Sequence, residues 1–136
     1  MRTVFADTFY WIALANPRDD WHDKAINASK LLFETCIVTT EEALTEFLNF
    51  FSGFGERIRQ AVVIMVRGIQ INPNIEVLPQ TPVTFKNGLE FYEKRKDKDY
   101  SLTDCIYMNA MRDKNLTEVL THDHNFAQEG FTILLQ

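Results

Sequence analysis

The chain opens with a short apolar segment, Thr3–Asp7, that ends in a carboxylate. The apolar stretch Thr8–Leu14 follows directly. This pattern predicts a buried strand that delivers Asp7 to the edge of a sheet and then passes into a short helix. In an open parallel α/β sheet, ligands bind beyond the carboxyl ends of the strands, so Asp7 stands where a reaction would occur. Taken alone, the simpler role of capping the following helix is favoured for Asp7.

Composition limits the classes of protein to which this sequence can belong. A length of 136 residues, 46% of them hydrophobic, predicts one globular domain with a substantial core. No apolar run approaches the roughly 20 residues of a membrane span, and no signal peptide is recognisable, so we expect a cytoplasmic protein. The formal charge of −5 argues against a broad basic surface that coats nucleic acid, although it does not exclude a nucleic-acid enzyme. Cys36 and Cys105 are expected to be buried thiols.

The rest of the chain alternates predicted helices and strands, which is typical of a parallel α/β sheet. After the first strand, further strands are expected over residues 37–39, 75–78, 119–121 and 131–135. Helices are expected over residues 8–14, 21–33, 55–69 and 81–96, with others opening after Thr39 and Ser101. No linker or repeat suggests a second domain.

Three more acids lie after predicted strands or at the start of predicted helices. Thr39-Thr40-Glu41-Glu42 has the form of a capping box with Thr39 at the N-cap, which gives Glu42 a structural role. Glu46 lies one turn further on a partly apolar face, where it is either a candidate ligand or an ordinary surface glutamate. Ser101-Leu102-Thr103-Asp104 is a second capping box, and Asp123 follows the strand predicted at 119–121.

Asp7, Glu46, Asp104 and Asp123 therefore place four carboxylates at one end of the predicted sheet, with no comparably placed lysine or arginine. Like charges within a few ångströms raise each other's pKa values unless a cation lies between them. Oxygen ligands suit Mg²⁺ or Mn²⁺ better than zinc, and such ions support phosphodiester hydrolysis. The sequence thus predicts a hard-cation site.

The motifs around these acids resemble the PIN domain family. They are Phe5-Ala6-Asp7-Thr8, Thr45-Glu46-Phe47, Tyr100-Ser101-Leu102-Thr103-Asp104-Cys105 and Thr121-His122-Asp123-His124-Asn125-Phe126, closing with Gly130-Phe131. The chain is most similar to the stand-alone type, the VapC toxins of prokaryotic toxin-antitoxin pairs. The resemblance covers the whole chain in order, and the SLTDC and THDHNF segments are its most specific parts.

This resemblance implies a single α/β domain over residues 1–136, with a five-stranded parallel sheet of order 3-2-1-4-5 flanked by helices. It implies an Mg²⁺- or Mn²⁺-dependent endoribonuclease. Asp7 and Asp104 would bind the metal most directly, and Glu46 and Asp123 would orient a metal-bound water or complete the coordination. The hydroxyls of Thr8, Ser101 and Thr103 would assist. Expected partners are an RNA substrate, a separate antitoxin protein and a second copy in a homodimer.

Two other functions stay open. A PIN fold could sequester partners without cutting anything, although such a module has no need for the repulsion among four acids. The enzyme could instead act in RNA processing, on structured DNA or on a small phosphoester, but no basic arch or DNA-binding appendage is present.

The phenylalanine-rich stretch 47–54 poses a separate question, because Phe50 and Phe54 fall partly off the apolar stripe of their helix. Either the helix predicted over residues 55–69 covers these rings, or they form an apolar groove for a partner protein or a second copy.

Overall fold

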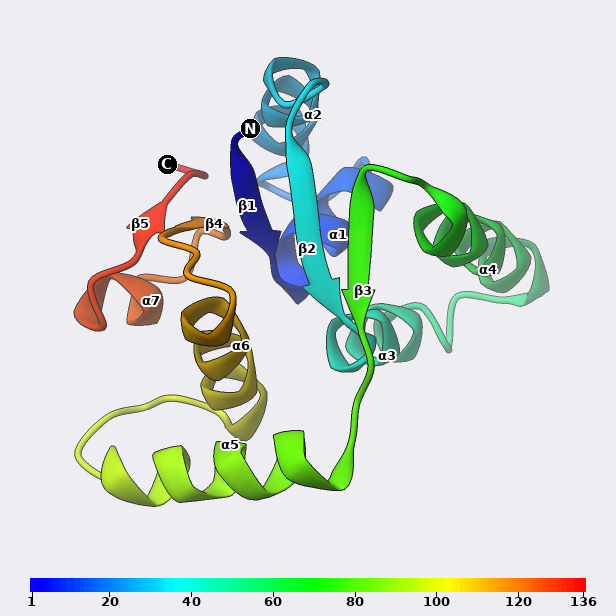
Figure 1. Cartoon of the computed structure of the whole chain (residues 1–136). Coiled ribbons are helices and arrows are strands. Elements are labelled where there is room, and N and C mark those ends of the chain that lie inside the picture. The colour runs from blue at the N-terminus through cyan, green and yellow to red at the C-terminus, as the bar shows by residue number, and fades with distance from the viewer.

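The computed structural model describes residues 1–136 as a five-stranded, all-parallel sheet with helices packed around it (Figure 1). The strands are β1 (Thr3–Ala6), β2 (Cys36–Thr40), β3 (Ile75–Leu78), β4 (Glu118–Leu120) and β5 (Thr132–Ile133). The helices are α1 (Thr8–Ala15), α2 (His22–Leu31), α3 (Glu41–Phe50), α4 (Glu56–Ile71), α5 (Pro82–Lys94), α6 (Leu102–Asp113) and α7 (Asn125–Gln128). The strand order is β3-β2-β1-β4-β5, which confirms the predicted fold class and sheet order.

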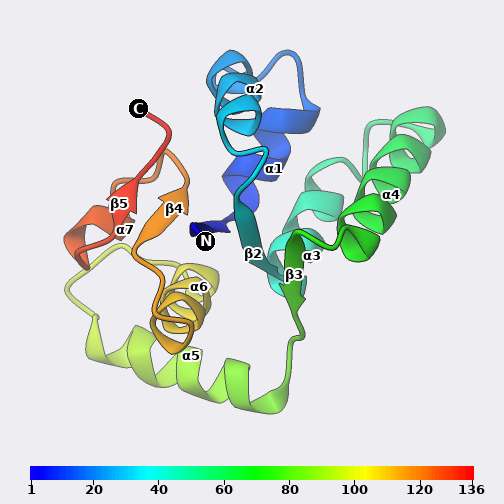
Figure 2. The same ribbon diagram turned by 45° about the horizontal axis from the view of Figure 1, so that its top comes forward.

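The strand order places the centre of the sheet at β1. Parallel neighbours cannot be joined by tight hairpins, so the chain crosses over through helices between successive strands. Figure 2 shows the strands between α1 and α2 on one side and α5 and α6 on the other. The first three strands run outward from β1 to β3, whereas β4 and β5 continue on the other side of β1. The carboxyl ends of β1 and β4 therefore meet at the switch point where ligands bind in sheets of this kind.

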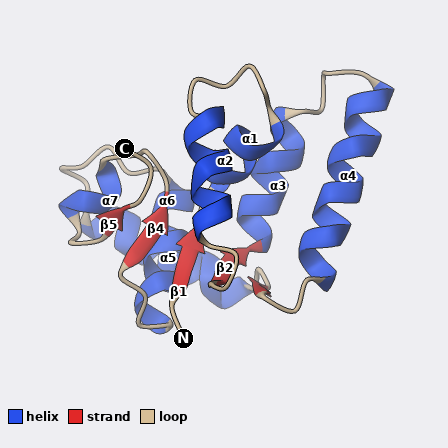
Figure 3. Ribbon diagram, turned by 90° about the horizontal axis from the view of Figure 1, so that it is seen from above, coloured by secondary structure: helices blue, strands red, loops and turns tan.

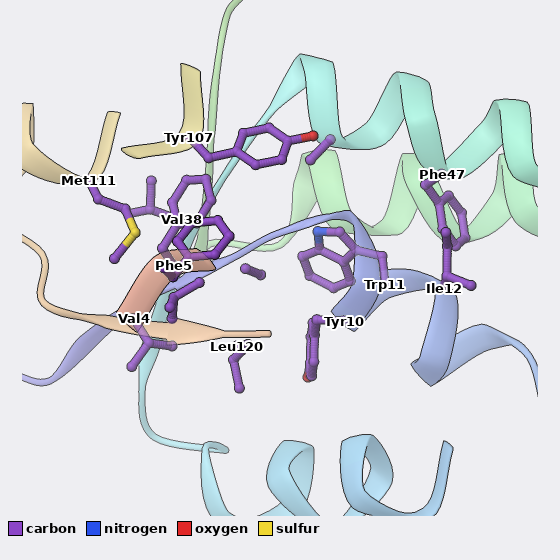
Figure 4. Close-up of a cluster of buried hydrophobic side chains, with 14 of the residues drawn as sticks. Val4, Phe5, Tyr10, Trp11, Ile12, Val38, Phe47, Tyr107, Met111 and Leu120 are labelled. Carbon is purple, nitrogen blue, oxygen red and sulfur yellow. The ribbon is translucent and has the colours of Figure 1, made fainter. Parts of the chain in front are cut away.

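The core forms where both faces of β1 are covered. Val4, Phe5 and Ala6 are fully buried, which explains why this strand has no polar alternation. Side chains from helices on both faces surround them (Figure 4). The buried Trp11 donates from its indole N–H to the Thr39 hydroxyl at 3.0 Å, and that hydroxyl donates to the Ala6 carbonyl at 2.8 Å. Every polar atom in this link has a partner, so α1 and β2 are fixed to the end of β1.

The helix after β2 begins one residue later than predicted. Thr40, not Thr39, is its N-cap and accepts from the Ala43 N–H at 3.1 Å. The Thr39 hydroxyl is already bonded to β1 and α1, so it cannot cap α3. Glu42 accepts instead from the Thr84 hydroxyl at 3.2 Å. The predicted Thr39–Glu42 capping box is therefore wrong, whereas the Ser101–Asp104 box is confirmed in both directions.

Several other boundaries differ from the predictions. Helix α2 begins at His22 and ends at Leu31, and β5 is shorter than expected at Thr132–Ile133. The four-residue helix α7 is too short to give a periodic signal and was not predicted. Cys105 is buried as expected, whereas Cys36 is only partly buried. None of the helices combines the length and apolar character needed to span a membrane.

Glu129 is the centre of an ion-pair network between α5, α6 and α7. Its side chain is only 7% exposed and accepts from Arg95 at 3.0 Å, Arg112 at 2.8 Å and the Tyr100 hydroxyl at 2.9 Å. Burial acts to raise the pKa of Glu129, but these hydrogen bonds outweigh burial and hold the pKa at about 2. The network also fixes Tyr100, which precedes the residue that caps α6.

We expect Glu129→Gln to lower the free energy of unfolding at pH 7 by about 2 kcal/mol. This figure is the cost of breaking a buried pair, reduced because both arginine side chains are more than one-third exposed. A lowered carboxylate pKa stabilises the fold above the unfolded value of 4.5, and that contribution disappears as the pH falls towards 2. Urea unfolding should therefore show the stability difference between the two proteins shrinking below about pH 4.5 and closing near pH 2. The exposed Glu93→Gln is the control, and equal stability of Glu129→Gln and wild type at pH 7 would contradict the assignment.

Candidate active site

One pocket of about 690 Å³ gathers all four of the predicted acids. Asp7 follows β1, Glu46 lies on α3, Asp104 is the third residue of α6, and Asp123 follows β4. The remaining lining residues are Thr8, Phe9, Ile12, Asn49, Phe50, Asp99, Ser101, Thr103, Tyr107 and Asn125. The pocket wall contains five carboxylates and no lysine or arginine.

Asp7 is the most buried of these acids, with 2% of its surface exposed. Its Oδ1 accepts from the Tyr10 N–H at 3.3 Å, so it caps α1 and also lines the pocket. Burial raises its pKa to about 8, and the charges of Asp104 and Asp123 act in the same direction. Hydrogen bonds from Thr121 and Tyr10 only partly oppose this shift. Asp7 thus both caps α1 and lines the acidic pocket.

Asp104 and Asp123 are held by backbone N–H groups. Asp104 accepts from the Ser101 N–H at 3.1 Å, while the Ser101 hydroxyl accepts from the Asp104 N–H at 3.0 Å. Burial raises the pKa of Asp104, the Ser101 N–H opposes that rise, and the charge of Asp123 adds to it. Asp123 accepts from the Asn125 N–H at 2.9 Å. These hydrogen bonds fix the Asp104 carboxylate at the start of α6 and the Asp123 carboxylate after the carboxyl end of β4.

Glu46 is compensated by hydroxyl groups rather than by a cation. Its Oε1 accepts from the Thr8 hydroxyl at 2.7 Å and the Tyr107 hydroxyl at 3.0 Å, and its Oε2 accepts from the Thr103 hydroxyl at 3.1 Å. Three donors from α1 and α6 thus hold a carboxylate of α3 in place. Glu46 is therefore not an ordinary solvated surface glutamate, because three donors from two other helices bond its carboxylate.

The hydroxyls predicted to assist the acids all contact them or one another. Thr8 and Thr103 donate to Glu46, and Ser101 caps Asp104. Ser101 and Thr103 also lie 3.1 Å apart, hydroxyl to hydroxyl.

The donor set fits a hard divalent cation, although it is not closed around a single point. No three side chains among the His, Cys, Asp and Glu residues converge closely enough to form a metal cage. Each of the four predicted carboxylates accepts hydrogen bonds from donors of its own. The buried Asp7 nevertheless lies where a cation would relieve its desolvation, and every polar group in the pocket wall supplies oxygen or an amide.

Sequence reasoning missed several residues of this pocket. Tyr107 is a buried residue of the core, but it also lies one turn after Asp104 on the same helix, and its hydroxyl donates to Glu46 in the pocket. That i, i+3 spacing was a usable signal. Asn125 lies two residues after Asp123, a second usable signal. No sequence signal pointed to Asn49 or Asp99, because only the folding of α3 and of the loop before α6 brings them to the pocket.

Comparison with known proteins gives relatives that match over nearly the whole chain. The 23S rRNA-specific endonuclease VapC20 of Mycobacterium tuberculosis, in strains CDC 1551 and H37Rv, is 24% identical over 130 residues, which is 94% of this chain and 95% of the relative. No family model matches the sequence.

Two solved structures share the fold. The crystal structure of Mycobacterium tuberculosis VapC20, described as a sarcin-ricin loop cleaving toxin, superposes with a TM-score of 0.79 at 22% identity and covers 95% of this chain and 96% of its own. VapBC2 from Rickettsia felis, bound to a DNA fragment from its promoter, gives a TM-score of 0.70 at 13% identity over 96% of each chain. These comparisons confirm the resemblance to VapC toxins that the sequence motifs predicted.

Proposed function

We propose that this chain, which shares its fold with the VapC toxins and resembles them in its motifs, is a divalent-metal-dependent endoribonuclease and the toxin of a toxin-antitoxin pair acting in the cytoplasm. The observation that carries the proposal is the pocket at the β1–β4 switch point, where Asp7, Glu46, Asp104 and Asp123 meet without a lysine or arginine. A non-enzymatic binding module would have no use for this concentration of negative charge. The similarity to an rRNA endonuclease over 94% of the chain supports the choice of RNA as substrate.

The four acids have different roles in this proposal. Asp7 and Asp104 would hold Mg²⁺ or Mn²⁺ directly, because burial makes their uncompensated charges the most costly. When bound, such an ion makes a water molecule more acidic and neutralises charge on the phosphate. Glu46 would orient the attacking water, since its hydrogen bonds from Thr8, Thr103 and Tyr107 fix the direction of its carboxylate. Asp123 would complete the coordination.

The direct test is cleavage of matched RNA and DNA oligonucleotides in parallel reactions containing EDTA, Mg²⁺ or Mn²⁺. We expect the purified chain to cut RNA with either metal and to leave DNA intact. Cleavage that persists in EDTA would exclude metal dependence. Cleavage of the DNA oligonucleotide but not of the RNA oligonucleotide would exclude RNA as the substrate.

Two glutamates one helical turn apart give a matched pair of variants. Glu46→Gln should reduce RNA cleavage at least about tenfold, because the amide removes the negative charge proposed to orient the water. Glu42→Gln, which changes a residue outside the pocket that accepts only from Thr84, should retain wild-type cleavage. Each should cost at most about 1 kcal/mol of stability. Initial cleavage rates and thermal melts on both variants check these expectations. Loss of cleavage in Glu42→Gln and not in Glu46→Gln would mean that Glu42, one helical turn earlier, is the active-site residue.

The proposed antitoxin contact is the apolar surface of α3 and α4. Phe50 and Phe54 are 44% and 50% exposed, so α4 does not cover them. Figure 3 shows α4 at the periphery, beyond α3 as seen from α1. Phe50 also lines the acidic pocket. An apolar segment of an antitoxin seated on these rings would therefore block the pocket entrance without a conformational change.

Phe54→Asp should weaken antitoxin binding while basal RNA cleavage stays at the wild-type rate, because Phe54 does not line the pocket. The antitoxin is first isolated by its binding to the immobilised wild-type chain. Calorimetry and inhibition assays then compare the variant with Phe33→Asp, which changes a more exposed ring that lies shortly before the amino end of β2. Unchanged inhibition of Phe54→Asp would place the antitoxin surface elsewhere.

The proposed homodimer has a different surface. Phe85, Leu89 and Tyr92 are about half exposed and follow one face of α5. Two such helices packed antiparallel about Leu89 bring Lys86 of each copy near Glu93 of the other, so the face is complementary to itself. Light scattering should give twice the chain mass of 15.9 kDa. The mass of one chain at micromolar concentration would contradict the dimer.

A further inference from the structure

Phe9 presents an aromatic ring to the acidic pocket. It lies in the first turn of α1, two residues after Asp7, and it is 42% exposed, whereas the next four residues of the helix are buried. The ring lines the same pocket as the four acids. An apolar ring left open beside a group of carboxylates is not explained by the packing of α1.

The ring of Phe9 is the end of an aromatic column. Its centroid lies 4.6 Å from that of His122, and the His122 ring stacks on Trp21 at 4.6 Å with an interplanar angle of 6°. The Lys24 ammonium lies 4.7 Å from the centroid of the Trp21 ring. Because His122 follows β4 and Trp21 precedes α2, three separate segments of the chain fix the position of Phe9.

The pocket needs a way to hold substrate that does not depend on basic side chains. Its wall contains no lysine or arginine that could pair with the phosphates flanking the cleaved one. Aromatic stacking can supply this binding, because every nucleobase has a flat face that stacks on an aromatic ring. Phe50 is the other exposed ring in the wall, but it packs against Phe51 and Phe54 in the turn that follows α3. Phe9 is thus the ring that belongs to the pocket alone.

We propose that Phe9 stacks on the base of an unpaired nucleotide next to the scissile phosphate, with His122 and Trp21 holding the ring in place. This inference rests on the proposed function and defines its substrate further. A base within a duplex is already stacked on both faces, so an open ring selects single-stranded or looped RNA. Any base can stack on one aromatic ring, so Phe9 would increase RNA affinity and position the nucleotide without distinguishing one base from another.

The first test measures binding without cleavage. Fluorescence anisotropy with a short single-stranded RNA oligonucleotide, in Ca²⁺ and with RNA integrity checked on a gel, compares wild type with Phe9→Leu and Phe9→Trp. The loss of one base–aromatic stack should weaken binding by roughly tenfold for Phe9→Leu, while Phe9→Trp stays close to wild type. Phe33→Leu is the control for an exposed ring outside the pocket. Circular dichroism confirms that each variant is folded.

The second test identifies the stacked base. Oligonucleotides that lack one base at each position in turn are bound to wild type and to Phe9→Leu. At the position that contacts the ring, removing the base should weaken wild-type binding and should add little to the loss already caused by Phe9→Leu. If the two losses add at every position, or if Phe9→Leu binds like wild type, the inference is wrong.

These outcomes separate the inference from the proposed function. If RNA binding depends on Phe9 but no cleavage occurs with Mg²⁺ or Mn²⁺, the stacking site stands and the nuclease proposal fails. If the chain cuts RNA and Phe9→Leu binds and cuts it with wild-type constants, the nuclease stands and the stacking site is overturned.

Discussion

Replacing Asp104 with asparagine is expected to abolish RNA cleavage while the protein stays folded. Asparagine keeps the size of the side chain and an oxygen that can still accept from the Ser101 N–H, so the capping box at the start of α6 survives. What the substitution removes is the negative charge at a proposed metal ligand. The cleavage rate should fall roughly 100-fold or more, since such an ion contributes several kcal/mol to the transition state.

The same substitution at the other end of α6 is the matched control. Asp113 is the last residue of the helix, is exposed and lies outside the acidic pocket. Asp113→Asn should therefore cut RNA like the wild type. Single-turnover cleavage with saturating enzyme, at several Mg²⁺ concentrations, measures the chemical step of both variants. An Asp104→Asn protein that cuts at the wild-type rate would remove Asp104 from the metal site.

The sequence predicted the positions of the acids better than it predicted their surroundings. Asp7 and Asp123 could be placed because each follows a strongly apolar strand, and parallel strands end at the same edge of a sheet. The strand order itself came from the family resemblance, since periodicity alone does not determine which strands are neighbours. For Asp104, the Ser101 capping box was a local signal that the structure repeats.

Features that depend on distant contacts could not be predicted. The Thr39 hydroxyl looked like a helix cap, but a tryptophan 28 positions earlier in the chain takes it as a hydrogen-bond acceptor and shifts the cap to Thr40. The hydroxyls that compensate Glu46 come from two other helices, 38 to 61 positions away. Local sequence patterns do not indicate hydrogen bonds between residues so far apart, so these contacts could be identified only in the folded structure.

Asp7→Asn is expected to raise the melting temperature of the metal-free protein, with an effect that grows with pH. The pKa of Asp7 is raised to about 8 by burial, against an ordinary value of 3.8. Between these values the folded protein holds a proton that the unfolded chain has lost, so the wild-type free energy of unfolding falls as the pH rises from about 4 to 8. Asparagine carries no charge to desolvate and removes this loss.

Thermal melts in EDTA at pH 5 and pH 8 test this expectation. The variant should melt several degrees above wild type at pH 8, whereas the difference should be much smaller at pH 5. Added Mg²⁺ should raise the wild-type melting temperature at pH 8 and leave Asp7→Asn nearly unchanged, because an ion that binds only the folded state stabilises it by mass action. Asp113→Asn should follow wild type throughout. A variant that melts below wild type at pH 8 in EDTA would show that Asp7 serves the fold mainly as the cap of α1, and that its charge is not the cost that a cation relieves.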